Sequence, residues 1–178
     1  MTTSFALASG YVLARVLTVG VLTALVPHDF VATPGFQAAT QAAECPVTQP
    51  NGETITTEPA GGNHGNDTLV TSLWPGGKIV FRRGGPGFVL ADGALSMKFG
   101  WWRRVSGSLT LEGRRLDGQA PPMRASIPDG YGLIGFQSTA LIFPTPGCWQ
   151  VTGHVGSGSL TFVTLVEKIG DGPVAAQR

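Results

Sequence analysis

The strongest constraint on the fold is a run of alternating, turn-punctuated residues near the C-terminus. Three β-rich segments follow one another there, at 138–143, 148–155 and 160–167. Pro144-Thr-Pro-Gly147 separates the first two, and Gly156-Ser-Gly158-Ser separates the last two; both have the chemistry of tight turns. The pattern predicts three consecutive antiparallel strands, the closing meander of a β-sandwich on which earlier strands pack.

Further strand signals lie upstream at 69–74, 78–81 and 88–90, between turns rich in Gly and Pro. The clearest strand covers 94–104, where apolar and smaller or polar residues alternate with period two. Alternate side chains of a strand point to opposite faces, so one set is expected in the core: Leu95, Met97, Phe99 and Trp101.

The other face of this strand carries Trp102, in line with Lys98 and Arg104. An exposed tryptophan among basic residues serves some proteins as a platform for a sugar or a protein partner, and in others a neighbouring loop covers it. The next strand, around Leu109, is expected to pair alongside, which would let Glu112 contact Lys98 or Arg104.

Residues 113–132 form the longest stretch without regular alternation. Long ordered loops on a rigid sandwich are places where binding sites tend to lie. The alternative is that Arg114 or Arg115 forms a structural ion pair with Asp117 or Asp129 that anchors the loop. The candidate binding residues are therefore Trp102, Lys98, Arg104, Arg114, Arg115 and Tyr131.

Residues 1–43 read as a signal peptide or hydrophobic leader. One basic residue, Arg15, precedes the apolar run 16–26, and small residues then lead to a cleavage point expected near Ala43. The alternative is a retained membrane anchor over 5–26, which would place Arg15 near the middle of the bilayer at a cost of roughly 2.5–3.5 kcal/mol. The sequence favours cleavage, and hence an extracellular or periplasmic protein.

Two cysteines, Cys45 and Cys148, remain after the leader. An even number in an exported chain predicts a disulfide; the alternative is two separate thiols. A catalytic pair of Cys148 with His154 fails on geometry, because six residues of strand separate two side chains by ~20 Å.

The sequence divides into the leader at 1–43, a polar N-terminal segment at 44–68, a sandwich domain at 69–168 and a flexible tail at 169–178. Within the polar segment, a short strand is expected at 54–57 and an exposed loop at 61–67.

Composition excludes several functions. The net charge of +1 gives no field to attract nucleic acid or an anionic membrane, so a membrane is expected to be contacted only through an uncleaved leader. We find no spacing of metal ligands, no phosphate-binding loop, no nucleotide fingerprint and no nucleophile elbow. No cofactor or metal is expected.

The segment FPTPGCWQVTGHVGSGSLTFVTLVE resembles the last two strands of bacterial immunoglobulin-like modules of exported proteins, with Pro146, Gly147, Trp149 and Val151 in the matching positions. The resemblance implies an all-β, immunoglobulin-like β-sandwich and supplies no activity. Cys148 departs from the usual arrangement, in which a disulfide crosses the core between the two sheets.

Three functional hypotheses follow. The first is a non-catalytic exported immunoglobulin-like domain with a binding or structural role in the cell envelope or outside the cell. The second is a carbohydrate- or peptide-binding module that uses Trp102 and the loop at 113–132, with an unknown protein or glycan as partner. The third is a small secreted hydrolase, for which the sequence shows no set of nucleophile, base or metal ligands at workable spacing.

Overall fold

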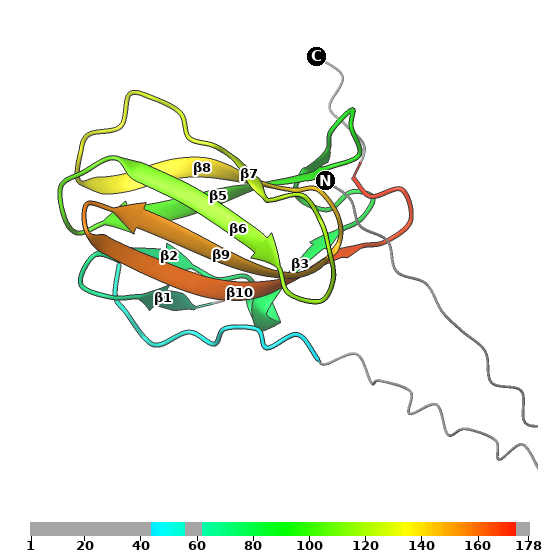
Figure 1. The fold of residues 1–178 in the computed structure, drawn as a ribbon, viewed down its shortest axis with the longest axis horizontal. Coiled ribbons are helices and arrows are strands. Elements are labelled where there is room, and N and C mark those ends of the chain that lie inside the picture. Colours follow the sequence, from blue (N-terminus) through cyan, green and yellow to red (C-terminus); the bar gives the residue numbers. More distant parts are fainter. Residues whose placement is uncertain (1–43, 56–61, 174–178) are drawn as a thin grey trace, which may run out of the picture. The chain divides into compact units, whose positions relative to one another are not determined.

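The computed structural model describes residues 44–55 and 62–173, which form two packed β-sheets (Figure 1). The leader expected over 1–43 lies outside the described residues, as do part of the strand expected at 54–57 and the last five residues of the tail. Within the described ranges, no helix is long and apolar enough to span a bilayer.

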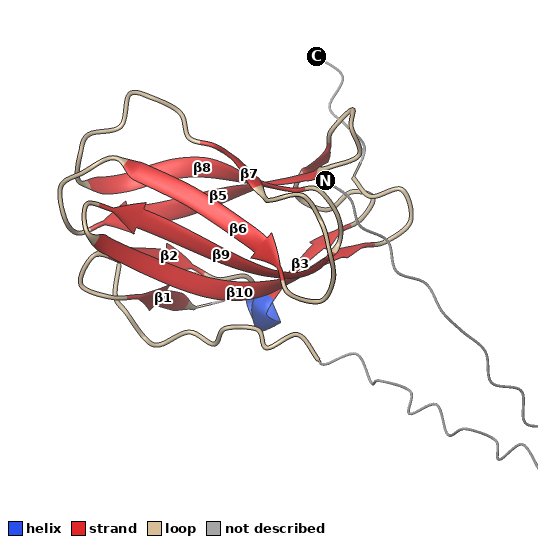
Figure 2. Cartoon of the chain, viewed as in Figure 1, coloured by secondary structure: helices blue, strands red, loops and turns tan. Residues whose placement is uncertain are grey.

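The strands, coloured red in Figure 2, account for nearly all regular structure. A single short 3-10 turn, η1 (Pro75–Gly77), is the one helical element among the described residues. The strands are β1 (Asn63–Gly65), β2 (Leu69–Ser72), β3 (Lys78–Phe81), β4 (Phe88–Val89), β5 (Leu95–Arg103), β6 (Leu109–Arg115), β7 (Arg124–Ser126), β8 (Gly135–Phe143), β9 (Gly147–Val155) and β10 (Gly158–Lys168).

The first sheet has the order β1-β2-β5-β8-β7, with β4 also paired to β5, and the second has the order β3-β10-β9-β6. Strand β3 runs parallel to β10, and the other neighbouring pairs are antiparallel. Two sheets with no helical layer define an all-β sandwich, which confirms the predicted class at that level.

The closing meander was predicted wrongly, although its three strands are present. Strand β8 belongs to the first sheet, whereas β9 and β10 belong to the second. The Pro-rich turn at 144–146 therefore carries the chain from one sheet to the other. The reason is that β5 and β7 occupy both edges of β8, so no edge is left for β9.

The pairing expected for β6 was also wrong. This strand pairs with β9 in the second sheet, and β5 pairs with β8 in the first. Glu112 consequently lies 3.2 Å from His154 on the neighbouring strand β9, away from Lys98 and Arg104. Residues 62–67 likewise differ from the exposed loop expected there, because β1 pairs with β2 and buries Asn63.

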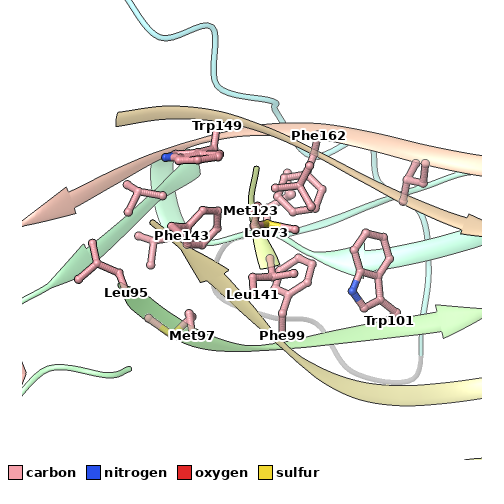
Figure 3. Close-up of a cluster of buried hydrophobic side chains, with 14 of the residues drawn as sticks. Leu73, Leu95, Met97, Phe99, Trp101, Met123, Leu141, Phe143, Trp149 and Phe162 are labelled. Carbon is pink, nitrogen blue, oxygen red and sulfur yellow. The ribbon is translucent and has the colours of Figure 1, made fainter. Parts of the chain in front are cut away.

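The core forms where inward-facing aromatic side chains of the two sheets meet (Figure 3). Trp101 on β5 is fully buried, as its place in the alternation predicted, and its ring lies 6.0 Å from that of Phe162 on β10. Gly153 on β9 makes room for it, since a Cβ at that position would lie 2.7 Å from Trp101 Cζ3. Trp102 points to the opposite face and is half-buried.

The predicted disulfide is present between Cys45 and Cys148, which are 103 residues apart in sequence. It attaches the start of a strap, residues 45–54, to β9. Further along the strap, the Thr48 backbone N–H donates to Val163 O of β10 at 2.9 Å, and Asn51 exchanges side-chain hydrogen bonds with Gly65 of β1 at 2.7 and 3.0 Å. The strap thus connects the second sheet to the edge of the first.

The two adjacent tryptophans should differ sharply in their effect on stability. Trp101→Ala is expected to lower the free energy of unfolding by about 3–5 kcal/mol, because it empties a large volume between the sheets. Trp102→Ala should cost about 1–2 kcal/mol, because a half-buried ring loses one aromatic pair and little core packing. Urea melts of both variants measure the difference, and equal losses would contradict the assigned faces.

The strap should depend on its disulfide. Replacing Cys45 and Cys148 together with serine is expected to lower the free energy of unfolding by about 2–5 kcal/mol, because the cross-link restricts the unfolded chain over a long loop. Urea melts with and without reductant test this. A reductant that destabilises the wild type and leaves the double variant unchanged is the matching control.

Candidate functional site

One end of the sandwich gathers three connections: the loop 104–108 between β5 and β6, the loop 127–134 between β7 and β8, and the turn 156–157 between β9 and β10 (Figure 1). The Gly107 backbone N–H donates to Leu133 O at 3.0 Å, which joins the first two loops. A Cβ on Gly107 would lie 3.0 Å from Val155, so the first loop also abuts the end of β9. We call this region the loop end.

Arg103, the last residue of β5, holds the loop end together from inside. Its side chain is 4% exposed. Its Nη1 donates to Gly107 O at 2.9 Å and its Nη2 donates to Gly132 O, so one guanidinium bonds both loops. On β8, Gln137 Nε2 donates to Pro128 O at 3.3 Å. Two buried polar side chains thus fix the backbone of an irregular loop in place.

The loop end exposes several large apolar side chains. Leu133 and Ile134 are 60% and 61% exposed, and Phe136, the second residue of β8, is 46% exposed. The Phe136 ring lies 4.9 Å from that of Trp102 and 6.2 Å from that of Tyr131. The three aromatic side chains and the two aliphatic side chains of the adjoining loop are together called the apolar tip: Trp102, Tyr131, Leu133, Ile134 and Phe136.

Local sequence explains why the tip is exposed. The backbone enters it through Gly130 and joins β8 at Gly135, with φ of +90° and +88°, values that favour glycine. The pairing of Trp102 with Phe136 across β5 and β8 places both rings on the outward face of the first sheet. A Cβ on Gly100 would lie 2.8 Å from the Phe136 ring, so the two rings lean over this glycine.

The structure separates the predicted binding residues into two groups. Trp102 and Tyr131 both contact Phe136, whereas Arg104, just beyond the end of β5, bonds Glu53 of the strap at 2.7 Å. Lys98 stands on the same face of β5, further from the loop end.

Arg114 and Arg115 lie on β6, in the other sheet. Arg114 Nε donates to Gln150 Oε1 at 2.8 Å. Arg115 Nε donates to Asp117 Oδ1 at 2.7 Å, so the structural ion pair considered for this loop is present. The fold does not bring these two arginines to the apolar tip.

Sequence reasoning missed Leu133, Ile134, Phe136 and the supporting role of Arg103. The available signal was the run 131–136, in which every residue other than glycine is apolar although the run follows a Pro-Asp-Gly turn. Apolar residues between glycines in a loop are poorly placed to fill a core, so they mark a surface that contacts something else.

The described residues do not form a metal site. Among the residues that the structure describes, no three His, Cys, Asp or Glu side chains gather as a metal site would require. Searches of protein-family models, of curated proteins and of solved structures find no match to this chain. The case for function therefore depends on the loop end itself.

The ion pair on β6 gives a pH-dependent contribution to stability. The hydrogen bond from Arg115 lowers the pKa of the Asp117 carboxyl below its ordinary value of 3.8. A carboxyl with a lowered pKa in the folded state stabilises the fold above pH 3.8, and this contribution is lost as the pH falls through the lowered pKa. Asp117→Asn should therefore make the free energy of unfolding fall less steeply as the pH is lowered into the acid range.

Urea melts over a series of pH values below neutral measure that slope. Asp129→Asn, a substitution in the same long segment but outside this ion pair, is the control and should leave the slope unchanged. If the free energy of unfolding falls equally with pH in the wild type and in Asp117→Asn, the ion pair makes no pH-dependent contribution to stability.

Proposed function

We propose that this protein is an exported, non-catalytic immunoglobulin-like domain that binds a partner through the apolar tip. The observation that carries the proposal is the exposure of four apolar side chains, three on the loop 127–134 and Phe136 at the start of β8, where hydrogen bonds from Arg103 and Gln137 fix the backbone of the loop. A contiguous exposed apolar cluster costs solubility, and on monomeric proteins such clusters are often functional.

The immunoglobulin-like type is supported by strand order. Immunoglobulin constant domains place strands A, B, E and D in one sheet and C, F and G in the other. In this chain β2, β5, β8 and β7 follow the order A-B-E-D, and β6, β9 and β10 follow the order C-F-G. Strands β1, β3 and β4 are additions to this scheme. The disulfide differs, because it joins Cys148 on β9 to the strap.

The position of the tip also supports a binding role. In immunoglobulin variable domains, ligand-binding loops include the connections between B and C and between F and G, which lie at one end of the sandwich. The corresponding connections here, 104–108 and 156–157, flank the apolar tip. A shared fold assigns no ligand by itself, and the exposed side chains of the tip add a specific surface to the analogy.

Export is supported by the disulfide, which persists in oxidising compartments, together with the leader predicted over 1–43. We place the protein outside the cytoplasm, in the cell envelope or beyond it. Mass spectrometry of the protein from its host should find a new N-terminus near Ala43.

A carbohydrate-binding role is the second candidate. It is favoured by the exposed aromatic ring of Phe136 beside Trp102 and Tyr131, since the C–H face of a sugar ring can pack against an exposed aromatic side chain. Arg114 and Arg115 of the earlier hypothesis are not part of this surface.

A substitution at the tip should abolish binding without unfolding the domain. The test compares three immobilised proteins: wild type, Phe136→Ser and Ile169→Ser. Each is tested on a glycan array and against extracellular and envelope fractions of the host, which are separated into protein, glycan and lipid. Ile169 is the matched control, because it is 58% exposed but lies after β10, at the other end of the sandwich.

The expected result is a component that wild type and Ile169→Ser retain and that Phe136→Ser binds about tenfold more weakly, as truncation of an aromatic anchor commonly produces. Retention that is equal for all three proteins would place the binding surface elsewhere. No retained component in any fraction would contradict the binding role.

A further inference from the structure

We infer that the partner of the apolar tip is a lipid surface, into which Leu133 and Ile134 insert. This inference rests on the proposed function, because it names the occupant of the same site. It goes beyond the sequence-based expectation that a membrane is contacted only through the leader.

The composition of the tip favours lipid over a folded protein partner. Its two most exposed side chains are Leu133 and Ile134, whereas the residues that contribute most to protein interfaces are tryptophan, tyrosine and arginine, with leucine under-represented. A bilayer accepts aliphatic side chains singly, because every apolar side chain that enters it leaves water independently.

The order of side chains along the tip matches the layers of a membrane interface. The two aliphatic residues, Leu133 and Ile134, are the most exposed, and the three aromatic residues that meet at Phe136 are less exposed. Tryptophan and tyrosine concentrate at the level of lipid headgroups, whereas leucine and isoleucine prefer the hydrocarbon. Insertion to the depth of Ile134 would leave Trp102 and Tyr131 near the headgroups.

Little charge opposes insertion. Residues 130–138 carry no charged side chain, and the exposed Asp129 precedes them in the same loop. Arg104, behind the tip, is paired with Glu53 at 2.7 Å, and Arg103 is buried with its guanidinium bonded to the loop carbonyls. Burial of the tip in a bilayer would therefore desolvate apolar groups and leave the nearby cations with the partners they already have.

The backbone of the tip is also suited to this role. Unpaired backbone groups are costly in hydrocarbon. Arg103 and Gln137 fix the loop by bonding the carbonyls of Gly107, Gly132 and Pro128, and Leu133 O accepts from Gly107. Four carbonyls at the base of the tip are thus satisfied within the protein.

The opposite end of the sandwich provides a competing hypothesis. Exposed Ile169 lies there beside β3, which is followed by Arg82 and Arg83, and its N–H donates to Phe81 O at 2.9 Å. Basic residues around an exposed apolar side chain would bind anionic lipid and would do so less well in salt. Insertion of the uncharged tip should instead be independent of anionic lipid and of salt.

The test uses the full chain with vesicles of phosphatidylcholine, alone or mixed with phosphatidylglycerol, at low and high salt. Quenching of tryptophan emission by brominated phosphatidylcholine reports contact with the bilayer. Residues 1–43 contain no tryptophan, so a leader that anchors the chain gives no quenching by itself. Trp101 and Trp149 are fully buried, and half-buried Trp74 follows the end of β2 that lies away from the loop end, which leaves Trp102 as the reporter beside the tip.

We expect quenching in both lipid mixtures and at both salt concentrations, and its loss in Trp102→Phe. Ile134→Asp and Leu133→Asp should each weaken vesicle-dependent quenching about tenfold or more, because a carboxylate enters the bilayer at high cost. Ile169→Asp and the double variant Arg82→Ala/Arg83→Ala should match the wild type. Unchanged urea midpoints establish that the tip variants remain folded.

Three outcomes would overturn the inference. Quenching that requires phosphatidylglycerol and disappears in Arg82→Ala/Arg83→Ala would assign lipid contact to the opposite end. Vesicle binding without quenching would assign it to the leader. Absence of vesicle binding, combined with a glycan or protein that Phe136→Ser fails to retain, would remove lipid as the partner and leave the proposed binding function standing.

Discussion

The packing of Trp101 between the sheets is the interaction on which the rest of the structure depends. Its ring crosses from β5 to contact Phe162 on β10, and it occupies space that a side chain on Gly153 would fill. This contact fixes the relative position of the two sheets, because a large rigid ring and a missing Cβ fit in only one register. The same register sends Trp102 outward, where it joins the apolar tip.

Outside the core, the strap holds the two sheets together and Arg103 holds the loops at one end. The strap ties the two sheets along one side, through the disulfide at β9 and the hydrogen bonds of Asn51 at β1. Arg103 is the last inward-facing residue of β5 and lies beyond the apolar core. Its guanidinium therefore reaches the carbonyls of the loops at that end. A buried polar side chain is tolerated there because its two Nη groups bond loop carbonyls, although its Nε has no partner within the described residues.

Much of the fold was accessible from the sequence. Period-two alternation placed Trp101 inside and Trp102 outside, and cysteine count paired Cys45 with Cys148. For the site, the alternation identified Trp102, and the long loop supplied Tyr131. Leu133, Ile134 and Phe136 were missed because apolar residues next to a strand read as core, and the sequence does not say that the tip has no sheet above it.

The sequence by itself determined where the longer strands lie, which face of β5 is apolar, and that the chain is cross-linked, whereas β1 and β7 lie in stretches read as loops. These properties are local, since a pleated strand sends alternate residues to opposite faces whatever it pairs with. Only the tertiary structure decided that β8 and β9 lie in different sheets, that Glu112 meets His154, and that Arg114 and Arg115 lie away from the tip. Strand partners are set by which edges remain free once all strands compete for them, and that competition involves the whole chain.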